Sequence, residues 1–300
     1  MTYTEITDMV ESLVNDNSTS ATTLIQTLIN QTQHYLLGFR KDITEKSTTA
    51  TTVASTQAYN LPYDYGKMFM VTVTVGGVAY PLLPIEDDIL WRDINARSSS
   101  YTSDIPQFYF IFDDQIFIYP TPTSASNTIT MYYHKTVKEM SVADYTTGTI
   151  TTLANAGTAV TGATTVWTAL FIGRFLRITN DGIWYEISAR TSNTAITIKK
   201  AYQGTAISAG SAAYTIGEMP IIPESYQDLL VWRPAAQYFQ QKGMLTESKF
   251  YWELFKEMEK QFKSERSYKV ESAMISGSMV DIKKSVHLAD PNMFPSSLTS

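Results

Sequence analysis

The sequence predicts an α+β protein with helices at both ends of the chain and two β-rich stretches between them. Apolar residues recur at helical spacing within residues 3–41 and 224–262. Aromatic and β-branched residues dominate residues 48–134, and residues 146–217 combine Gly, Ala, Thr and Ser in short strand-like runs. We expect a helical bundle of two N-terminal and two C-terminal helices, a small antiparallel β-region, an inserted all-β domain of barrel or sandwich type, and an extended C-terminal arm.

The composition excludes several classes of protein. Of the 300 residues, 44% are hydrophobic and 17% are charged, which is typical of a chain with a real core and not of a disordered one. The net charge of −6 provides no basic field to hold DNA or RNA. The absence of cysteine rules out disulfides and thiolate metal sites. Without a signal-like N-terminus or an apolar run of membrane-spanning length, we expect a protein that makes no membrane contact and is either kept in the cytoplasm or assembled there into something larger.

Two helices are predicted at the N-terminus. The first covers residues 3–15, where one stripe holds Ile6, Met9, Val10, Leu13 and Val14. The second covers residues 20–41, and its apolar stripe runs from Leu24 to Phe39. Arg40 and Lys41 fall in its last turn, where positive charge favours a helix C-terminus.

A β-region is expected next. Thr48–Leu61 is one β-rich run, and Met68–Val75 and Val78–Leu82 alternate as strands around the turn Gly76-Gly77. A short helix should follow Pro84, because Glu86, Asp87 and Asp88 suit a first helical turn and Leu90, Trp91 and Ile94 continue it. A further strand is expected over Thr128–His134.

The stretch from Asp104 to Pro122 is predicted to be a β-hairpin. Two aromatic-rich runs flank Asp113-Asp114, and prolines lie near both outer ends. A two-residue loop pairs Phe112 with Gln115, Phe110 with Phe117 and Phe108 with Tyr119 on one face, and Ile111 with Ile116 and Tyr109 with Ile118 on the other. Both faces are apolar, so the hairpin should be covered on both sides. Asp-Asp is a weaker turn than Asn-Gly, so a register shifted by one residue is an alternative.

Residues 146–217 are predicted to form an inserted all-β domain. Asn180-Asp181-Gly182 marks a turn between two of its strands. The expected strands are Thr149–Leu153, Phe175–Thr179, Ile183–Ala189, Ala195–Ile198 and Ala212–Ile216.

Two helices and a tail are expected after the insertion. Glu224 to Lys242 should be helical, with a kink near Leu230 caused by Pro234 and a C-terminal cap at Gly243. Thr246 should begin the last helix, whose stripe is Phe250, Tyr251, Leu254, Phe255, Met258 and Phe262. From Lys269 to Ser300 the helical period is lost while apolar residues persist, which predicts an extended arm lying on its own body or on a neighbour.

The sequence shows no pattern of catalytic, cofactor-binding or metal-ligating residues. His34, His134 and His287 are not at ligand spacing. Asp113-Asp114 is better explained as a turn, and Glu86 to Asp88 as a helix start, than as paired catalytic carboxylates. Trp184 and Tyr185 have either a core or a sugar-stacking role. Because side chains alternate between the two faces of a strand, one of the two should point into the core and the other outward. The last helix carries Lys256, Lys260, Lys263 and Arg266 among glutamates, which indicates an exposed ion-pair face.

Three short patterns in this order resemble a known family. They are Ile-Pro-Gln-Phe-Tyr at 105–109, Ile-Phe-Ile-Tyr-Pro-Thr-Pro at 116–122, and Ile-Thr-Met-Tyr-Tyr at 129–133. With the order of helices and strands, they resemble the head-to-tail adaptor (connector) proteins of tailed bacteriophages, most of all the tail tubular protein A type of short-tailed phages. The resemblance covers 1–145 and 218–268, and Arg233-Pro234 departs from the family's unbroken Ala-rich helix.

The resemblance implies a structural virion protein without enzymatic activity or cofactors. It would form a dodecameric ring that binds the portal protein, carries tail or nozzle proteins, and lets double-stranded DNA pass without specific binding. Residues 1–145 and 218–268 would form the adaptor core, 146–217 the insertion and 269–300 the arm that reaches the portal. Its candidate interface residues are apolar: Met274, Ile275, Met279, Val280, Ile282, Val286, Leu288, Met293 and Phe294. A tail or fibre component that binds host glycans and a wall-degrading hydrolase remain alternatives.

Overall fold

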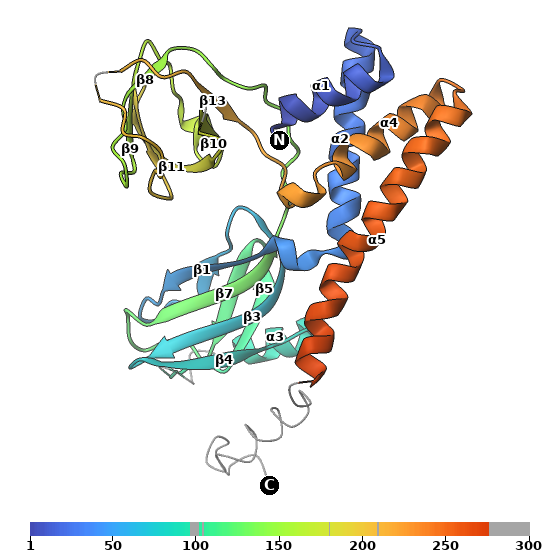
Figure 1. Ribbon diagram of the computed structural model, residues 1–300. Coiled ribbons are helices and arrows are strands. Elements are labelled where there is room, and N and C mark those ends of the chain that lie inside the picture. Colours follow the sequence, from blue (N-terminus) through green and yellow to red (C-terminus); the bar gives the residue numbers. More distant parts are fainter. Residues whose placement is uncertain (97–101, 104, 180, 209, 276–300) are drawn as a thin grey trace. The chain divides into compact units, whose positions relative to one another are not determined.

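The computed structural model describes residues 1–96, 102–103, 105–179, 181–208 and 210–275, with side chains through 265. Five α-helices and two curled β-sheets lie in this part of the chain, which confirms the α+β class (Figure 1). The chain divides into two compact units, one of Met1–Phe39 with Glu139–Ser300 and one of Arg40–Lys138. The expected division into core, insertion (146–217) and arm (269–300) follows other boundaries and stays a prediction.

Four helices belong to the first unit, and α4 packs against each of the other three. Their bounds are α1 (Tyr3–Val14), α2 (Thr19–Phe39), α4 (Leu229–Gln241) and α5 (Leu245–Ile275). The apolar stripes predicted for α1, α2 and α5 supply many of the buried side chains of this unit, among them Ile6, Val10, Ile25, Leu36, Phe255 and Phe262. Met9, Leu13, Tyr35 and Phe39 belong to the same stripes but are exposed, and Leu230 of α4 is buried although no stripe was predicted for that helix.

Helix α1 is closed at both ends by its own residues. The Thr2 hydroxyl accepts the Glu5 N–H while the Glu5 carboxylate accepts the Thr2 N–H, and Asn15 ends the helix in the left-handed conformation. Helix α2 ends at Phe39, so Arg40 and Lys41 do not form its last turn as predicted. Arg40 instead binds Asp42 at 2.9 Å, and the chain tightens into the 3₁₀ turn η1 (Lys41–Thr44).

Helix α4 begins later than predicted. Glu224–Tyr226 forms the 3₁₀ turn η4, and the α-helix starts at Leu229. Pro234 lies inside α4, and the predicted kink near Leu230 stays a prediction. Gly243 follows the helix with φ of +78°, which confirms the predicted glycine cap.

Helix α5 differs from its prediction at both ends. Phe255 and Phe262 are buried as expected, but Phe250 is 57% exposed. The helix continues to Ile275, so residues 269–275 are helical and not part of an extended arm. The remainder of the predicted arm, residues 276–300, lies outside the described residues.

The second unit is built on a seven-stranded sheet in the order β1-β7-β3-β4-β5-β6-β2 (Figure 1). Its strands are β1 (Glu45–Thr51), β2 (Ala58–Asn60), β3 (Tyr65–Val75), β4 (Val78–Pro84), β5 (Phe108–Phe112), β6 (Gln115–Tyr119) and β7 (Thr128–Lys135). The predicted single run 48–61 is two strands at opposite edges of the sheet. Leu83 and Pro84 pair with β5 in parallel, so the region is not wholly antiparallel as expected.

The predicted hairpin is confirmed in its two-residue register. Phe110 pairs with Phe117 and Ile111 with Ile116, which excludes the shifted alternative. Asp113 and Asp114 have φ of +50° and +57°, the conformation that a tight hairpin turn requires. One hairpin face joins the sheet's main core, and the other packs with Trp91 of α3 (Asp88–Ala96), so both faces are covered.

Helix α3 starts at Asp88, and Glu86 and Asp87 precede it instead of filling its first turn. The Asp87 carboxylate accepts the N–H groups of Ile89 at 2.8 Å and Leu90 at 3.3 Å, which is the contact of an N-cap. The acidic run therefore ends the loop and caps the helix, and its charges still complement the helix dipole.

Asp64, in the turn that precedes β3, binds residues of β1 and β7. Its carboxylate accepts hydrogen bonds from Lys46 Nζ and from the Tyr133 hydroxyl, both at 2.7 Å. Burial opposes the charge of Asp64, but these two bonds outweigh it and lower its pKa. Burial, followed by the bond to Asp64, raises the pKa of Tyr133 to about 12.

We expect Asp64→Asn to reduce the loss of this unit's unfolding free energy that accompanies a fall in pH. The folded pKa of Asp64 lies below the value of about 3.9 in an unfolded chain, so its carboxylate stabilises the fold above that pH and stops doing so as the pH falls through the folded value. Urea unfolding between pH 3 and 7 measures the difference. Asp114→Asn in the exposed turn is the control for removing one charge, and equal pH profiles for both variants would contradict the assignment.

The second sheet lies in the first unit, within residues 149–217. Its order is β13-β10-β11-β12-β9-β8, with all pairs antiparallel. The strands are β8 (Thr149–Thr152), β9 (Ala159–Ala163), β10 (Phe175–Ile178), β11 (Trp184–Ser192), β12 (Ala195–Ile198) and β13 (Tyr214–Gly217). Bridges from Ile150 to Ala212 and from Leu153 to Ile207 join the two edges, so the sheet curls around its own core. Strand β9 was not predicted.

Candidate functional site

The predicted interface residues are only partly described. Met274 and Ile275 lie at the end of α5 as helical backbone, and their side chains are outside the described set. The other seven candidates fall on residues 276–300, outside the described residues: Met279, Val280, Ile282, Val286, Leu288, Met293 and Phe294. The arm therefore stays a predicted interface.

A groove in the second unit is lined by aromatic rings. It has a volume of 290 Å³ and lies between α3 and the hairpin, bounded by Asp88, Trp91, Arg92, Asn95, Phe110, Phe112 and Phe117. Trp91 stacks on Phe110 with ring centroids 5.1 Å apart, and Phe112 continues the stack at 6.4 Å. Phe112 is 59% exposed, so the aromatic layer runs from the core to the surface. Exposed apolar surface of this kind marks interaction sites.

A rigid loop of the second sheet also presents apolar side chains. Trp167 and Phe171 point into the sheet's core, while Val166, Leu170 and Ile172 are exposed. The Tyr145 hydroxyl accepts the Val166 N–H at 2.8 Å, and the Asn193 carbonyl accepts the Trp167 N–H at 3.0 Å. The loop is thus fixed by buried anchors while its outer face remains uncovered in the single chain.

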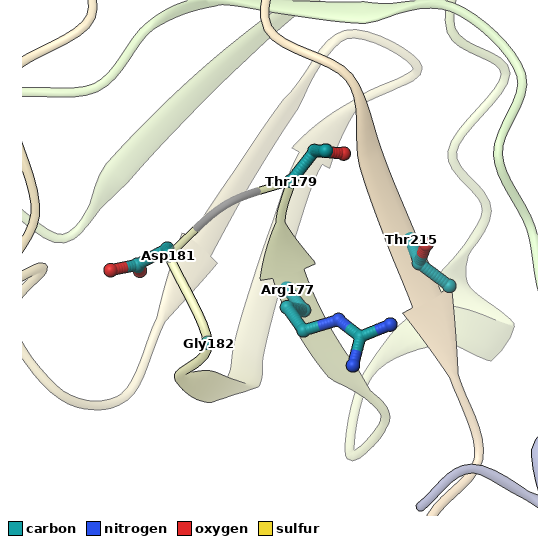
Figure 2. Close-up of a pocket in the computed structure, with 5 residues that line it drawn as sticks. All are labelled: Arg177, Thr179, Asp181, Gly182 and Thr215. Atoms are coloured by element: carbon teal, nitrogen blue, oxygen red, sulfur yellow. The ribbon is translucent and has the colours of Figure 1, made fainter.

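A second depression, of 390 Å³, lies on the second sheet at Arg177, Thr179, Asp181, Gly182 and Thr215. Figure 2 shows that the carboxylate of Asp181 points away from the guanidinium of Arg177. Arg177 binds Glu5 at 3.0 Å and lies 4.4 Å from the ring centre of Trp184. Tyr185 is buried in the sheet's core, so the predicted alternation of Trp184 and Tyr185 is confirmed. These side chains do not converge on one ligand.

The charged and histidine residues have structural contacts. His134 Nδ1 lies 3.0 Å from the Lys41 carbonyl oxygen, and His34 is exposed on α2. Lys263 binds Glu259 at 2.9 Å, as expected for an ion-pair face, and lies over the Phe39 ring.

Among the residues that the structure describes, no group of three His, Asp or Glu side chains is arranged to hold a metal. No helix in that part of the chain is long and apolar enough to span a membrane.

The N-terminus holds the two linkers that enter and leave the second sheet. The Thr2 hydroxyl donates to Asp144 at 2.8 Å, and the Tyr3 N–H donates to the Glu218 carbonyl at 2.8 Å. The Glu218 carboxylate in turn accepts the backbone N–H groups of Ser141 and Val142. This joint was not predicted from the sequence. The spacing of Thr2 and Glu5 is the usual capping-box signal, and it could have pointed to Thr2.

We expect Gly217→Ala to destabilise this joint by about 1–3 kcal/mol, the usual cost of overpacking. A Cβ at Gly217 would lie 2.3 Å from Thr2 Cγ2 and 2.7 Å from Asp144 Oδ1. Thermal unfolding measures the loss. Gly38→Ala on α2 is the matched control, because its Cβ meets nothing within 4 Å and alanine favours a helix. Equal effects of the two changes would refute the close contact.

Comparison with known proteins identifies the family. The model of the SU10 adaptor protein family matches residues 1–177. That match takes in α1, α2, the whole seven-stranded sheet and the second sheet as far as β10. No curated protein shows a significant match to the chain. Because the family model covers more than half of the chain, this protein belongs to the SU10 adaptor proteins, structural proteins of the phage virion that join head and tail.

Proposed function

We propose that the protein assembles into a closed ring that binds the portal of the phage head, carries tail or nozzle proteins, and extends the channel for double-stranded DNA. The family match over residues 1–177 is the observation that carries this proposal. A dodecamer matched to the portal, assembled in the host cytoplasm, is the form we propose. The likeness to the tail tubular protein A type is part of the same proposal.

The surface of the single chain supports a ring. A head-to-tail ring buries two different surfaces of every copy. The described residues offer separate uncovered apolar surfaces, at the groove beside α3 in the second unit and at the loop of Val166, Leu170 and Ile172 in the first. A net charge of −6 suits a channel through which DNA slides, because a basic wall would bind phosphates by releasing counterions.

Mixing the purified protein with portal rings tests the proposal. Native mass spectrometry and electron micrographs should show whole sets of copies added to each portal as a closed ring. A single chain that ignores the portal, or partial and variable occupancy at saturation, would contradict it.

We further propose that the C-terminal arm makes the portal contact, through the apolar residues from Met274 to Phe294. Deleting residues 276–300 leaves α5 whole and should abolish sedimentation with portal rings while far-UV circular dichroism shows unchanged helix content. If the truncated chain binds the portal as well as the full-length chain does, the proposed role of the arm is refuted. Ring formation is tested separately by the mixing experiment above.

A further inference from the structure

We propose that the start of α1 is a conformational latch, because the residues that cap this helix also hold the second sheet. Displacing the sheet then frays the first turn of α1, and fraying that turn loosens the sheet. The latch lies within the first unit and does not depend on the proposed ring. Such a coupling is reciprocal, since each side changes the stability of the other by the same free energy.

The hydroxyl group of Thr2 serves both the helix and the sheet. Its oxygen accepts the Glu5 N–H at 3.2 Å, which caps the first turn of α1. The same hydroxyl donates to Asp144 Oδ2 at 2.8 Å, on the linker that enters the second sheet. The Asp144 N–H donates in turn to the Thr4 hydroxyl at 3.0 Å. Movement of this linker therefore disturbs the cap of the helix directly.

The carboxylate of Glu5 is shared in the same way. Its Oε2 accepts the Thr2 N–H at 2.9 Å, which is the second half of the capping box, and its Oε1 accepts Arg177 Nη2 of β10 at 3.0 Å. Arg177 pairs across the strands with Trp184 of β11, and its guanidinium carbon lies 4.4 Å from the centre of that ring. Both residues of the capping box thus bind the helix and the second sheet or its linker at the same time.

The linker that leaves the sheet completes the latch. The N-terminal end of α1 lies beside both linkers (Figure 1), and the Tyr3 N–H donates to the Glu218 carbonyl at 2.8 Å. The first N–H groups of a helix have no acceptor within the helix, so this carbonyl satisfies one of them. Release of the sheet would leave the group without its partner.

The closed latch is incompletely bonded, which favours opening. Asp144 Oδ1 is buried, and no donor among the described residues reaches it. A buried acceptor without a donor is costly, and water can satisfy it once the linker moves away. The ion pair of Glu5 with Arg177 is about one-third exposed on both sides, so it contributes little to keeping the latch closed.

Opening of the latch would reach the packing of the helices. Tyr3 and Ile6 are buried, and α1 packs against α4. A partner that displaces the second sheet would therefore loosen the contact of α1 with α4 at the start of α1. The rest of α1, from Val10 onwards, keeps its own packing and should stay helical.

Hydrogen exchange of the Glu5 and Ile6 amides, followed by NMR in the full-length protein, tests the coupling from sheet to helix. Arg177→Met removes the ion pair without changing the sequence of α1, and both amides should exchange about two- to fivefold faster, as expected for loss of a partly exposed pair. Lys199→Met is the matched control, because it breaks the 2.7 Å pair with Glu186 in the same sheet and should leave both rates unchanged. Unchanged rates in Arg177→Met, or equal acceleration in Lys199→Met, would overturn the proposal.

Thr2→Val tests the coupling from helix to sheet. The linker amides of Val142 and Tyr145, which donate to the Glu218 carboxylate and the Ile216 carbonyl, should exchange several-fold faster. Ser18→Ala is the control, since it removes the hydroxyl that accepts the Ala21 N–H at the start of α2 and should leave these amides unchanged. Far-UV circular dichroism checks that both variants fold. If Thr2→Val accelerates exchange in α1 alone, the capping box is an ordinary helix cap and the latch is refuted.

Discussion

Phe255→Ala should lower the free energy of unfolding of the helical part by about 3–5 kcal/mol, the usual cost of deleting a fully buried phenylalanine. Phe255 is 1% exposed and lies in the contact of α5 with α2 and α4. Its ring centre is 5.6 Å from that of Trp252 and 6.4 Å from that of Tyr35.

A second contribution comes from Arg233. Its guanidinium lies 3.9 Å from the ring centre of Tyr35 and 5.9 Å from that of Phe255, and burial lowers its pKa. A partly desolvated cation on aromatic faces gains about 0.5–2 kcal/mol from them. Removing one of the two rings therefore weakens the environment of this charge as well as the packing.

Phe250→Ala is the matched control for Phe255→Ala. It removes the same side chain from the same helix, but Phe250 is exposed, so we expect a change within about 0.5 kcal/mol. Hydrogen exchange of the α4 and α5 amides reports the loss locally, which matters because a chain with two compact units need not unfold in one step. Similar losses for both variants would show that Phe255 is not in the core.

The local patterns of the sequence predicted much of the fold. The hairpin around Asp113-Asp114 could be paired residue by residue for a two-residue loop, because side chains alternate with a period of two. The weak Asp-Asp turn left a register shifted by one residue open, and only the structure excluded it. The glycines at 76, 77 and 243 marked turns and a cap because they adopt positive φ. These features depend only on neighbours in the chain.

Features that depend on distant partners escaped prediction. Strand β9 (Ala159–Ala163) has the sequence Ala-Val-Thr-Gly-Ala, which has weak strand preference and is held by pairing with β8 and β12. The parallel contact of β4 with β5 depends on the path of the intervening chain. Phe250 matched the helical period, yet its side chain is 57% exposed and its ring packs on that of its neighbour Tyr251.

The candidate site was predicted in the same uneven way. The sequence indicated that both apolar faces of the hairpin are packed against other elements. It did not identify α3 as the element that packs on one of these faces, nor Phe112 as the exposed end of the aromatic stack. Burial of one face depends on which helix packs there, and residue spacing within the hairpin carries no information about that.

Trp167→Ala should destabilise the second sheet by at least about 3–5 kcal/mol. Trp167 is fully buried, and a Cβ on Gly162 would lie 2.8 Å from its ring, so the indole fills the space above a glycine. Its Nε1–H donates to the Tyr214 hydroxyl at 2.9 Å, and that hydroxyl donates to the Thr147 carbonyl at 2.6 Å. Burial raises the pKa of Tyr214, as expected for a hydroxyl held in this dry network.

Trp184→Ala is the control for loss of an indole, because Trp184 is only half-buried, with Arg177 over its ring, and we expect a smaller loss of about 1 kcal/mol. Hydrogen exchange should show the Trp167→Ala loss in the amides of β8 to β13 and leave those of α1, α2 and α4 protected. Such local opening would mean that the second sheet is a separate cooperative unit, as expected for an inserted domain over 146–217. Loss of protection in the helices to the same extent would instead mean that the joint at Thr2 and Gly217 couples the two parts into one.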